Sequence, residues 1–224
     1  SVIFEDVDDN FNKEVKIAVN CEEISRSVTQ LAAVDSEGNG VLTDMYVRAV
    51  NGNGRVLVHV ENLLFWIDTQ QSIKDAKEAA ENYLGVEVND VDLTYSIDIN
   101  NTNIVGGPSA GAAFAVATVS TLQNMTLRKD AIITGTVEED GTIGKVGGIL
   151  AKGKAAKEGG YKIFLVPEGE KNLIENRRTK NCEKLGSVSI CEVKYESVDI
   201  DVEEELGIKV VEVKNLEEAL EYML

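Results

Sequence analysis

A serine precedes an apolar helix in the stretch "NIVGGPSAGAAFAVATVS", where its hydroxyl could act as a nucleophile. Proline suits the first turn of a helix, so the pattern predicts a helix over about 108–123 with Ser109 near its start. The unpaired backbone N–H groups of a first turn, together with the helix dipole, can hold an oxyanion. Ser109 is therefore either a nucleophile, with Gly107, Pro108 and Ala110 forming the oxyanion turn, or an ordinary capping residue.

A serine hydroxyl is a weak nucleophile and needs a base to activate it. His59 is the only histidine in the sequence, and its place in a predicted strand without a nearby acid pattern favours a structural or surface role. In the helix predicted over 147–158, Lys152 shares a face with small and apolar residues, whereas Lys154 and Lys157 point toward solvent. Burial lowers the pKa of a lysine, which would let Lys152 accept a proton. The alternative is that its ammonium extends past the apolar surface to water.

Ser109 and Lys152, taken with the residues around them, resemble the proteolytic domain of the Lon family of ATP-dependent proteases, in its archaeal-type branch. The segment "GPSAG" is similar to the nucleophile motif of that family, and "TGTVEEDGTIGKVGGILAKGKAA" is similar to the block that contains its lysine. The similarity extends from about Gln30 to the C-terminus. It implies peptide-bond hydrolysis by a Ser-Lys dyad, with Ser109 attacking the carbonyl and Lys152 as general base.

The same resemblance implies supporting residues around the dyad. Thr134 matches a threonine whose hydroxyl orients the lysine amine, although a plain β-branched strand residue is the alternative. Glu61 aligns with an acid at the end of a strand near the active site. Many bacterial members carry an aspartate three residues before the serine, where this chain has Gly106. Glu61 and Asp98 are the alternatives for a substitute acid, and the departure leaves the orientation and resting form of the site open.

The elements expected around these residues make a single α+β domain of the Lon-protease type, with mixed strands and packed helices. Residues 27–224 are expected to form this domain, and residues 1–26 an N-terminal arm or linker. The "NGNG" between two β-rich runs predicts a hairpin. Strands are predicted at 41–50, 55–62, 91–99, 131–137, 162–167, 188–194 and 208–213, and further helices at 72–85, near 170–176 and at 215–224.

The composition excludes several other classes of function. A formal net charge of −17 argues against binding to a nucleic-acid backbone, and no apolar run is long enough to span a bilayer. Three cysteines and one histidine without ligand spacing predict no metal site. Because an odd number of cysteines in an intracellular chain favours free thiols, we expect Cys182 and Cys191 to be unpaired, with a disulfide as the alternative.

No nucleotide site is predicted, because "GTIGKVGG" lacks the glycine spacing and the Ser or Thr of a phosphate-binding loop. ATP and magnesium would be used by an AAA+ ATPase module that the resemblance implies in the full-length protein. It also implies unfolded polypeptide substrates, a homo-hexameric ring and a cytoplasmic location, with membrane tethering through segments outside this chain. Charge repulsion favours a monomeric isolated domain at low salt. A non-catalytic Lon-like scaffold and a hydrolase of small amides are the competing interpretations.

Overall fold

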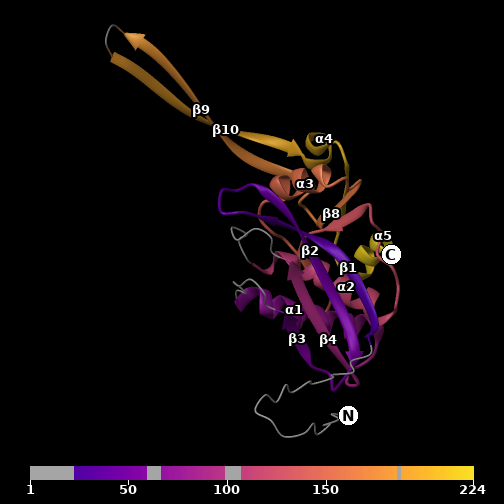
Figure 1. Cartoon of the computed structure of the whole chain (residues 1–224). Coiled ribbons are helices and arrows are strands. Elements are labelled where there is room, and N and C mark those ends of the chain that lie inside the picture. The colour runs from indigo at the N-terminus through magenta and orange to yellow at the C-terminus, as the bar shows by residue number, and fades with distance from the viewer. Residues whose placement is uncertain (1–22, 60–66, 99–106, 186–187) are drawn as a thin grey trace, which may run out of the picture.

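The computed structural model describes residues 23–59, 67–98, 107–185 and 188–224, in which helices and strands are mixed as the predicted α+β class requires (Figure 1). The strands are β1 (Glu23–Val34), β2 (Gly40–Asn51), β3 (Val56–His59), β4 (Val91–Asp98), β5 (Ala131–Ile133), β6 (Thr136–Val137), β7 (Ile143–Gly144), β8 (Ile163–Pro167), β9 (Asn172–Leu185), β10 (Val188–Asp201) and β11 (Lys209–Val213). The helices are α1 (Ile67–Leu84), the 3₁₀ turn η1 (Pro108–Ala110), α2 (Gly111–Leu122), α3 (Ile149–Glu158), α4 (Val202–Leu206) and α5 (Leu216–Met223). β1 begins before the expected domain boundary at 26 and continues past it.

The first sheet has the strand order β1-β2-β4-β3, so the predicted hairpin between 41–50 and 55–62 is wrong. β4 lies between these two strands, antiparallel to β2 and parallel to β3. The "NGNG" turn instead surrounds the buried carboxylate of Asp92, which accepts hydrogen bonds from the N–H groups of Asn53 at 2.8 Å and Arg55 at 2.9 Å. These bonds direct the chain around the end of β4 rather than back along β2.

The helix α2 forms the centre of the core. Every residue from Gly111 to Thr121 is buried, as its alanine-rich apolar sequence predicts. α2 packs against β1 and β2 on one side, and α1 and α5 also contact it. The ring of Tyr95 on β4 meets the ring of Phe114 edge to face, with centroids 5.9 Å apart. A serine immediately before this helix is therefore mounted on a rigid element.

A second sheet, with the order β11-β8-β5, is parallel throughout. The single strand predicted over 131–137 is interrupted, because β5 ends at Ile133 and β6 pairs with β7 instead. At the break Gly135 has a φ of 156°, and a Cβ there would lie 2.7 Å from Cγ2 of Ile143. The parallel strands β5 and β8 thus end side by side, with Thr134 directly after β5.

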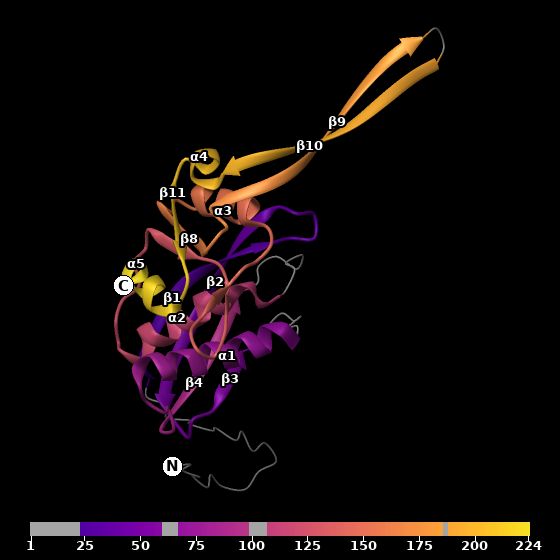
Figure 2. The ribbon, with the colours of Figure 1, turned by 180° about the vertical axis from the view of Figure 1, so that it is seen from behind.

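Strands β9 and β10 form a long antiparallel arm that projects from the rest of the domain (Figure 2). The short helix predicted near 170–176 is therefore wrong, and the strand predicted at 188–194 extends to Asp201. The arm contacts the body at its base, where β10 meets α4. There Leu173 packs against a buried apolar cluster and Ile200 is itself buried. In the paired strands the backbone N–H and C=O groups of this segment form hydrogen bonds between β9 and β10, whereas a single helical turn would leave most of them without partners.

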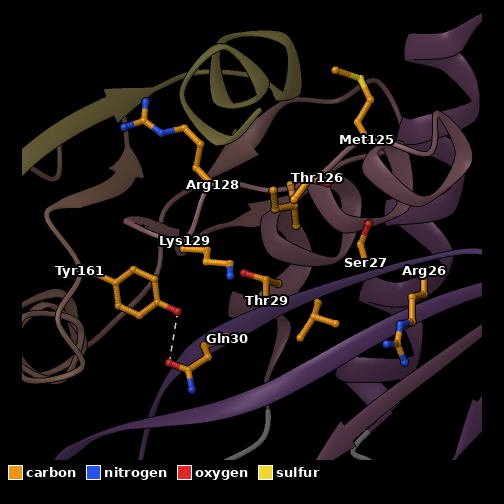
Figure 3. Close-up of a pocket in the computed structure, with 11 residues that line it drawn as sticks. Arg26, Ser27, Thr29, Gln30, Met125, Thr126, Arg128, Lys129 and Tyr161 are labelled. Atoms are coloured by element: carbon orange, nitrogen blue, oxygen red, sulfur yellow. Dashed lines mark hydrogen bonds between the residues drawn. The ribbon is translucent and has the colours of Figure 1, made fainter.

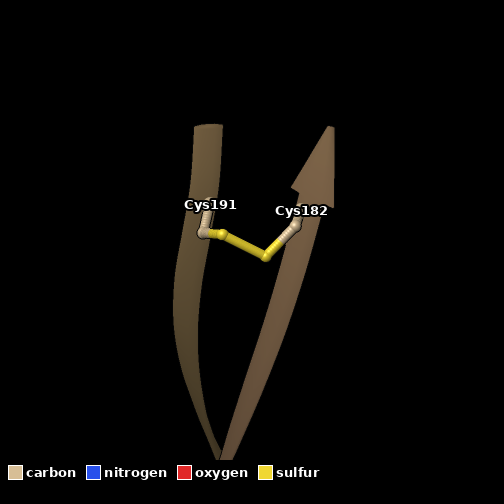
Figure 4. Close-up of a disulfide and its surroundings, with 2 residues drawn as sticks. All are labelled: Cys182 and Cys191. Atoms are coloured by element: carbon tan, nitrogen blue, oxygen red, sulfur yellow. A yellow bond between two sulfur atoms is a disulfide. The ribbon is translucent and has the colours of Figure 1, made fainter. Parts of the chain in front are cut away.

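The expectation of free thiols in the arm is also wrong. Cys182 and Cys191 lie opposite each other in the register of β9 and β10 and form a disulfide (Figure 4). Residues directly opposite one another project from the same face of a two-stranded sheet. The exposed side chains of Ile174, Val193 and Tyr195 share the face of the disulfide.

Removal of this disulfide is expected to loosen the arm and leave the body folded. A Cys182→Ser/Cys191→Ser variant, made with Cys21→Ser as the background and control, should keep its thermal unfolding midpoint within about 2 °C. The reason is that the main described contact of the arm with the body lies at its base, where β10 meets α4. Limited trypsin digestion should cut the variant faster at Lys180 and Lys184. A fall of more than about 5 °C in the midpoint would show that the disulfide stabilises the body as well.

None of the helices within the described ranges is both long and apolar enough to span a membrane.

Candidate active site

Ser109 lies in the single 3₁₀ turn η1, directly before α2, and is partly buried. The N-cap residue of α2 is Ala110, and neither η1 nor α2 has a side-chain cap hydrogen bond. Gly107 is fully extended, with φ 169° and ψ 176°, so the chain turns between Gly107 and Pro108. Ser109 is therefore not a capping residue of either helix. Its hydroxyl lies at the start of the buried helix and makes no cap hydrogen bond there.

The serine segment is fastened to the break between β5 and β6. The carbonyl oxygen of Ser109 accepts hydrogen bonds from the N–H of Gly135 at 3.0 Å and from Oγ1 of Thr134 at 3.2 Å. The two segments approach closely at Gly111, where a Cβ would lie 2.8 Å from the backbone nitrogen of Val137. A glycine is needed at this position because any larger side chain would collide with β6, and not because of its backbone conformation. Its lack of a side chain lets the start of α2 pack against β6.

Lys152 is buried in α3, with 3% of its surface exposed. Lys154 and Lys157 of the same helix are exposed, so the face assigned to each lysine from the sequence is confirmed. A side chain buried to this extent does not extend to water past its apolar stem. α3 begins after Gly148, which has a left-handed φ of 74° and packs so closely on Val34 that a Cβ would lie 2.6 Å from its Cγ2.

The amine of Lys152 donates a hydrogen bond to Oγ1 of Thr134 at 3.2 Å. Thr134 is itself buried, and its hydroxyl donates in turn to the carbonyl oxygen of Ser109. Burial of Lys152 lowers its pKa to about 8, against the opposing effect of the Glu170 carboxylate. Near pH 8 about half of the molecules therefore carry a neutral amine that can accept a proton.

Glu170 is an acid of this site that the sequence reasoning missed. It follows β8, is 6% exposed, and accepts a hydrogen bond from the N–H of Val146 at 3.3 Å. Burial raises its pKa, while the Val146 N–H, Lys145 and Lys152 each oppose that change. A signal for it existed in the sequence, since Thr134 and Glu170 each follow a short apolar strand, and parallel neighbouring strands end at the same edge of a sheet.

The other predicted site residues are not all described. Glu61 and Gly106 lie outside the described residues. His59 is the last residue of β3 and Asp98 the last of β4, and both are exposed. Thr134 is the supporting residue that the structure brings into hydrogen-bond contact with Lys152. Within the described ranges, no three His, Cys, Asp or Glu side chains are grouped as ligands for a metal ion.

A cavity of about 330 Å³ lies away from this site, between β1 and the segment before β5 (Figure 3). Arg26, Lys129 and Tyr161 are among its lining residues, and the Tyr161 hydroxyl donates a hydrogen bond to Gln30 at 3.1 Å. Ser109, Thr134 and Lys152 are not among the residues that line it. The cavity therefore takes no part in the arrangement around Ser109 and Lys152.

Comparison with known proteins decides the family. Residues 103–202, which include Ser109, Thr134, Lys152 and Glu170, match the Lon protease (S16) C-terminal proteolytic domain. The archaeal Lon protease of Methanocaldococcus jannaschii is 27% identical over 199 residues, which cover 86% of this chain and 30% of the relative. The chain contains a Lon-type proteolytic domain of the archaeal type.

Bacterial Lon proteases match shorter segments of this Lon-type domain. The protein of Buchnera aphidicola subsp. Acyrthosiphon pisum is 43% identical over 70 residues, 31% of this chain and 9% of the relative. That of Neorickettsia sennetsu is 35% identical over 85 residues, 37% of this chain and 10% of the relative. The chain thus spans under a third of the length of these relatives. The resemblance to the Lon proteolytic domain is confirmed, and a domain of this family is a peptidase domain.

Proposed function

We propose that this Lon-type domain hydrolyses peptide bonds with Ser109 as nucleophile and Lys152 as general base. The observation that carries the proposal is the shared hydrogen bonding of Thr134, which binds the Lys152 amine on one side and the Ser109 backbone on the other. The low pKa of Lys152 supports its role as a base, since an ordinary lysine is protonated at neutral pH. The position of Ser109 before α2 supports its role as the nucleophile.

In the proposed reaction the neutral amine of Lys152 takes the proton of Ser109 as Oγ attacks the carbonyl carbon of the peptide. The tetrahedral oxyanion is held by backbone N–H groups of Ser109 and Ala110, in the turn at the start of the helix. The Lys152 ammonium then gives its proton to the leaving amine, and the C–N bond breaks to leave an acyl-enzyme. A water molecule, deprotonated by Lys152, hydrolyses the ester and restores the hydroxyl of Ser109.

We propose unfolded or damaged polypeptides as the substrates and an attached AAA+ ATPase as the partner in the full-length protein, where that module uses ATP and magnesium. The same proposal includes a homo-hexameric ring and a cytoplasmic location, with a membrane tether outside this chain. The named Lon protease relatives, of which this chain covers 30% and 10%, support further domains in the full-length protein. Thiol titration of protein taken from intact cells tests the location, because a reducing compartment would keep Cys182 and Cys191 as free thiols.

The experiment that tests the peptidase proposal needs no ATP. The chain is incubated with unfolded casein and with a fluorogenic peptide, beside variants of Ser109 and Lys152. Cleavage that disappears in both variants supports the dyad. A non-catalytic scaffold would cleave neither substrate, and its Ser109 would not react with a serine-directed phosphonate probe.

Thr134 supplies a graded test of the same arrangement. Thr134→Val keeps the shape of the side chain but loses both hydroxyl hydrogen bonds, so kcat/KM for the fluorogenic peptide is expected to fall about 10- to 100-fold. Thr134→Ser keeps the hydroxyl and should remain within a few fold of the parent. Thr142→Val changes an exposed threonine and is the matched control. Parent-like activity in Thr134→Val would show that the amine needs no partner at this position.

A further inference from the structure

The site contains a second buried charge beside Lys152. Among the described residues, the buried side chains that can carry a charge are Asp92, Lys152 and Glu170. Asp92 is paired with Arg55 at 2.7 Å, beside the turn that leads into β3. Lys152 and Glu170 act on each other's charge at the other sheet, and both are more than nine-tenths buried. Burial of a charged carboxylate or a charged amine lowers the stability of the fold unless a group of opposite charge lies nearby.

Glu170 is also tied to the helix that carries Lys152. Both of its carboxylate oxygens lie 3.3 Å from the backbone nitrogen of Val146. Val146 stands two residues before Gly148, whose carbonyl oxygen accepts the N–H of Lys152 in the first turn of α3. The carboxylate therefore fixes the turn from which α3 starts, and with it the position of the lysine.

Three elements place polar or charged groups around Lys152 and Glu170. Thr134 comes from the end of β5 and Glu170 from the turn after β8. Lys145 comes from the turn before α3, and its charge lowers the pKa of the Glu170 carboxyl. Its Nζ lies beside Gly169, 3.0 Å from where a Cβ on that glycine would stand. Within the described part of the chain, Glu170 is the carboxylate whose charge acts on Lys152.

We propose that Glu170 is the acidic positioning residue of this site, which holds the start of α3 through Val146 and stabilises the ammonium that forms when Lys152 takes a proton. The second role rests on the proposed peptidase function, in which that proton comes from Ser109. A buried carboxylate that stabilises the protonated base in this way resembles the aspartate of a Ser-His-Asp triad.

The charge of Glu170 can be removed while its hydrogen bond is kept. In Glu170→Gln the side-chain oxygen still accepts from the Val146 N–H, but the negative charge beside Lys152 is lost. Burial lowers the pKa of Lys152 to about 8, and the Glu170 carboxylate acts in the opposite direction. Loss of the carboxylate should therefore move the pKa of Lys152 from about 8 to a lower value. A residue with a structural role alone would not move this titration.

The test is a direct titration of the Lys152 amine by NMR, using protein with ¹³C at lysine Cε. The resonance is assigned by its absence in Lys152→Arg. The parent is compared with Glu170→Gln, with the conservative variant Glu170→Asp, and with Glu168→Gln, which removes an exposed carboxylate from the same turn. Thermal unfolding of each variant establishes that the compared proteins are folded.

We expect the Lys152 midpoint near pH 8 in the parent and in Glu168→Gln, and a decrease of about one pH unit in Glu170→Gln. Glu170→Asp should recover part of that decrease, and the acid limb of kcat/KM should move in the same direction. An unchanged midpoint in folded Glu170→Gln overturns the proposal. If the midpoint moves as expected while Ser109→Ala still cleaves peptides, the peptidase assignment fails but the control of Lys152 by Glu170 stands.

Discussion

Ser109→Ala is expected to abolish peptide cleavage, with a loss of about 10⁴-fold or more in kcat, because no other group replaces a missing nucleophile. The fold should be preserved. The hydrogen bonds that fasten this residue to Gly135 and Thr134 use its carbonyl oxygen, which alanine retains. Hydrolysis of the fluorogenic peptide and of unfolded casein, both without ATP, measures the effect.

Two controls make this result specific to Ser109. Ser36→Ala changes an exposed serine in the turn between β1 and β2 and should keep parent activity. A serine-directed phosphonate probe should label the parent once, at Ser109, and leave Ser109→Ala unlabelled. Cleavage that survives in Ser109→Ala would overturn the nucleophile assignment. If the parent cleaves nothing but is labelled at Ser109, the enzyme is latent, and the absence of labelling would favour a scaffold.

Lys152 gives the second large effect and a characteristic pH dependence. Since the amine must be neutral to accept a proton, kcat/KM should rise about tenfold for each pH unit below pH 8 and level off above it. At pH 6 about 1% of the amine is neutral if its pKa is about 8. Both Lys152→Met and Lys152→Arg should lose activity by about three orders of magnitude, because neither side chain accepts a proton in this range.

The stability of these variants separates a base from a structural residue. The pKa of Lys152 is lower in the folded state than its ordinary 10.5, so between about pH 8 and pH 10.5 the unfolded chain binds more protons. The free energy of unfolding of the parent should therefore rise with pH through that window, and this rise should be absent in Lys152→Met.

Lys154→Met is the matched control on the same helix, because Lys154 is exposed. It should keep the activity and the pH profile of the parent. A profile that is flat between pH 6 and pH 9 in the parent would contradict the role of a neutral lysine.

Several features of the site could be predicted from the sequence because they depend on residues close together in the chain. The proline and glycines before an apolar run place Ser109 at a helix entrance, and α2 begins at Gly111 as that pattern requires. The 3.6-residue period of α3 assigns Lys152 to its small, apolar face and Lys154 to solvent. The glycine-rich block around Lys152 also carries the family resemblance that the comparison confirms.

Other features depend on contacts between distant segments, and the tertiary structure alone decided them. The hairpin signal at "NGNG" is outweighed by Asp92, about 40 residues away, whose carboxylate binds the turn so that β4 can lie between β2 and β3. The arm and its disulfide follow from the pairing of β9 with β10, which the helical pattern near 170–176 does not reveal.

Glu170 shows the same limit within the site. The apolar strand before Glu170 predicts a position at the edge of a sheet but not a role in the site, because that role depends on two parallel strands that end together and on a helix start that its carboxylate binds. By itself, the sequence determined the helix entrance at Ser109, the buried face of Lys152 and the family. The tertiary structure decided which groups surround that lysine, because burial and neighbouring charge, which set its pKa, come from segments far apart in the chain.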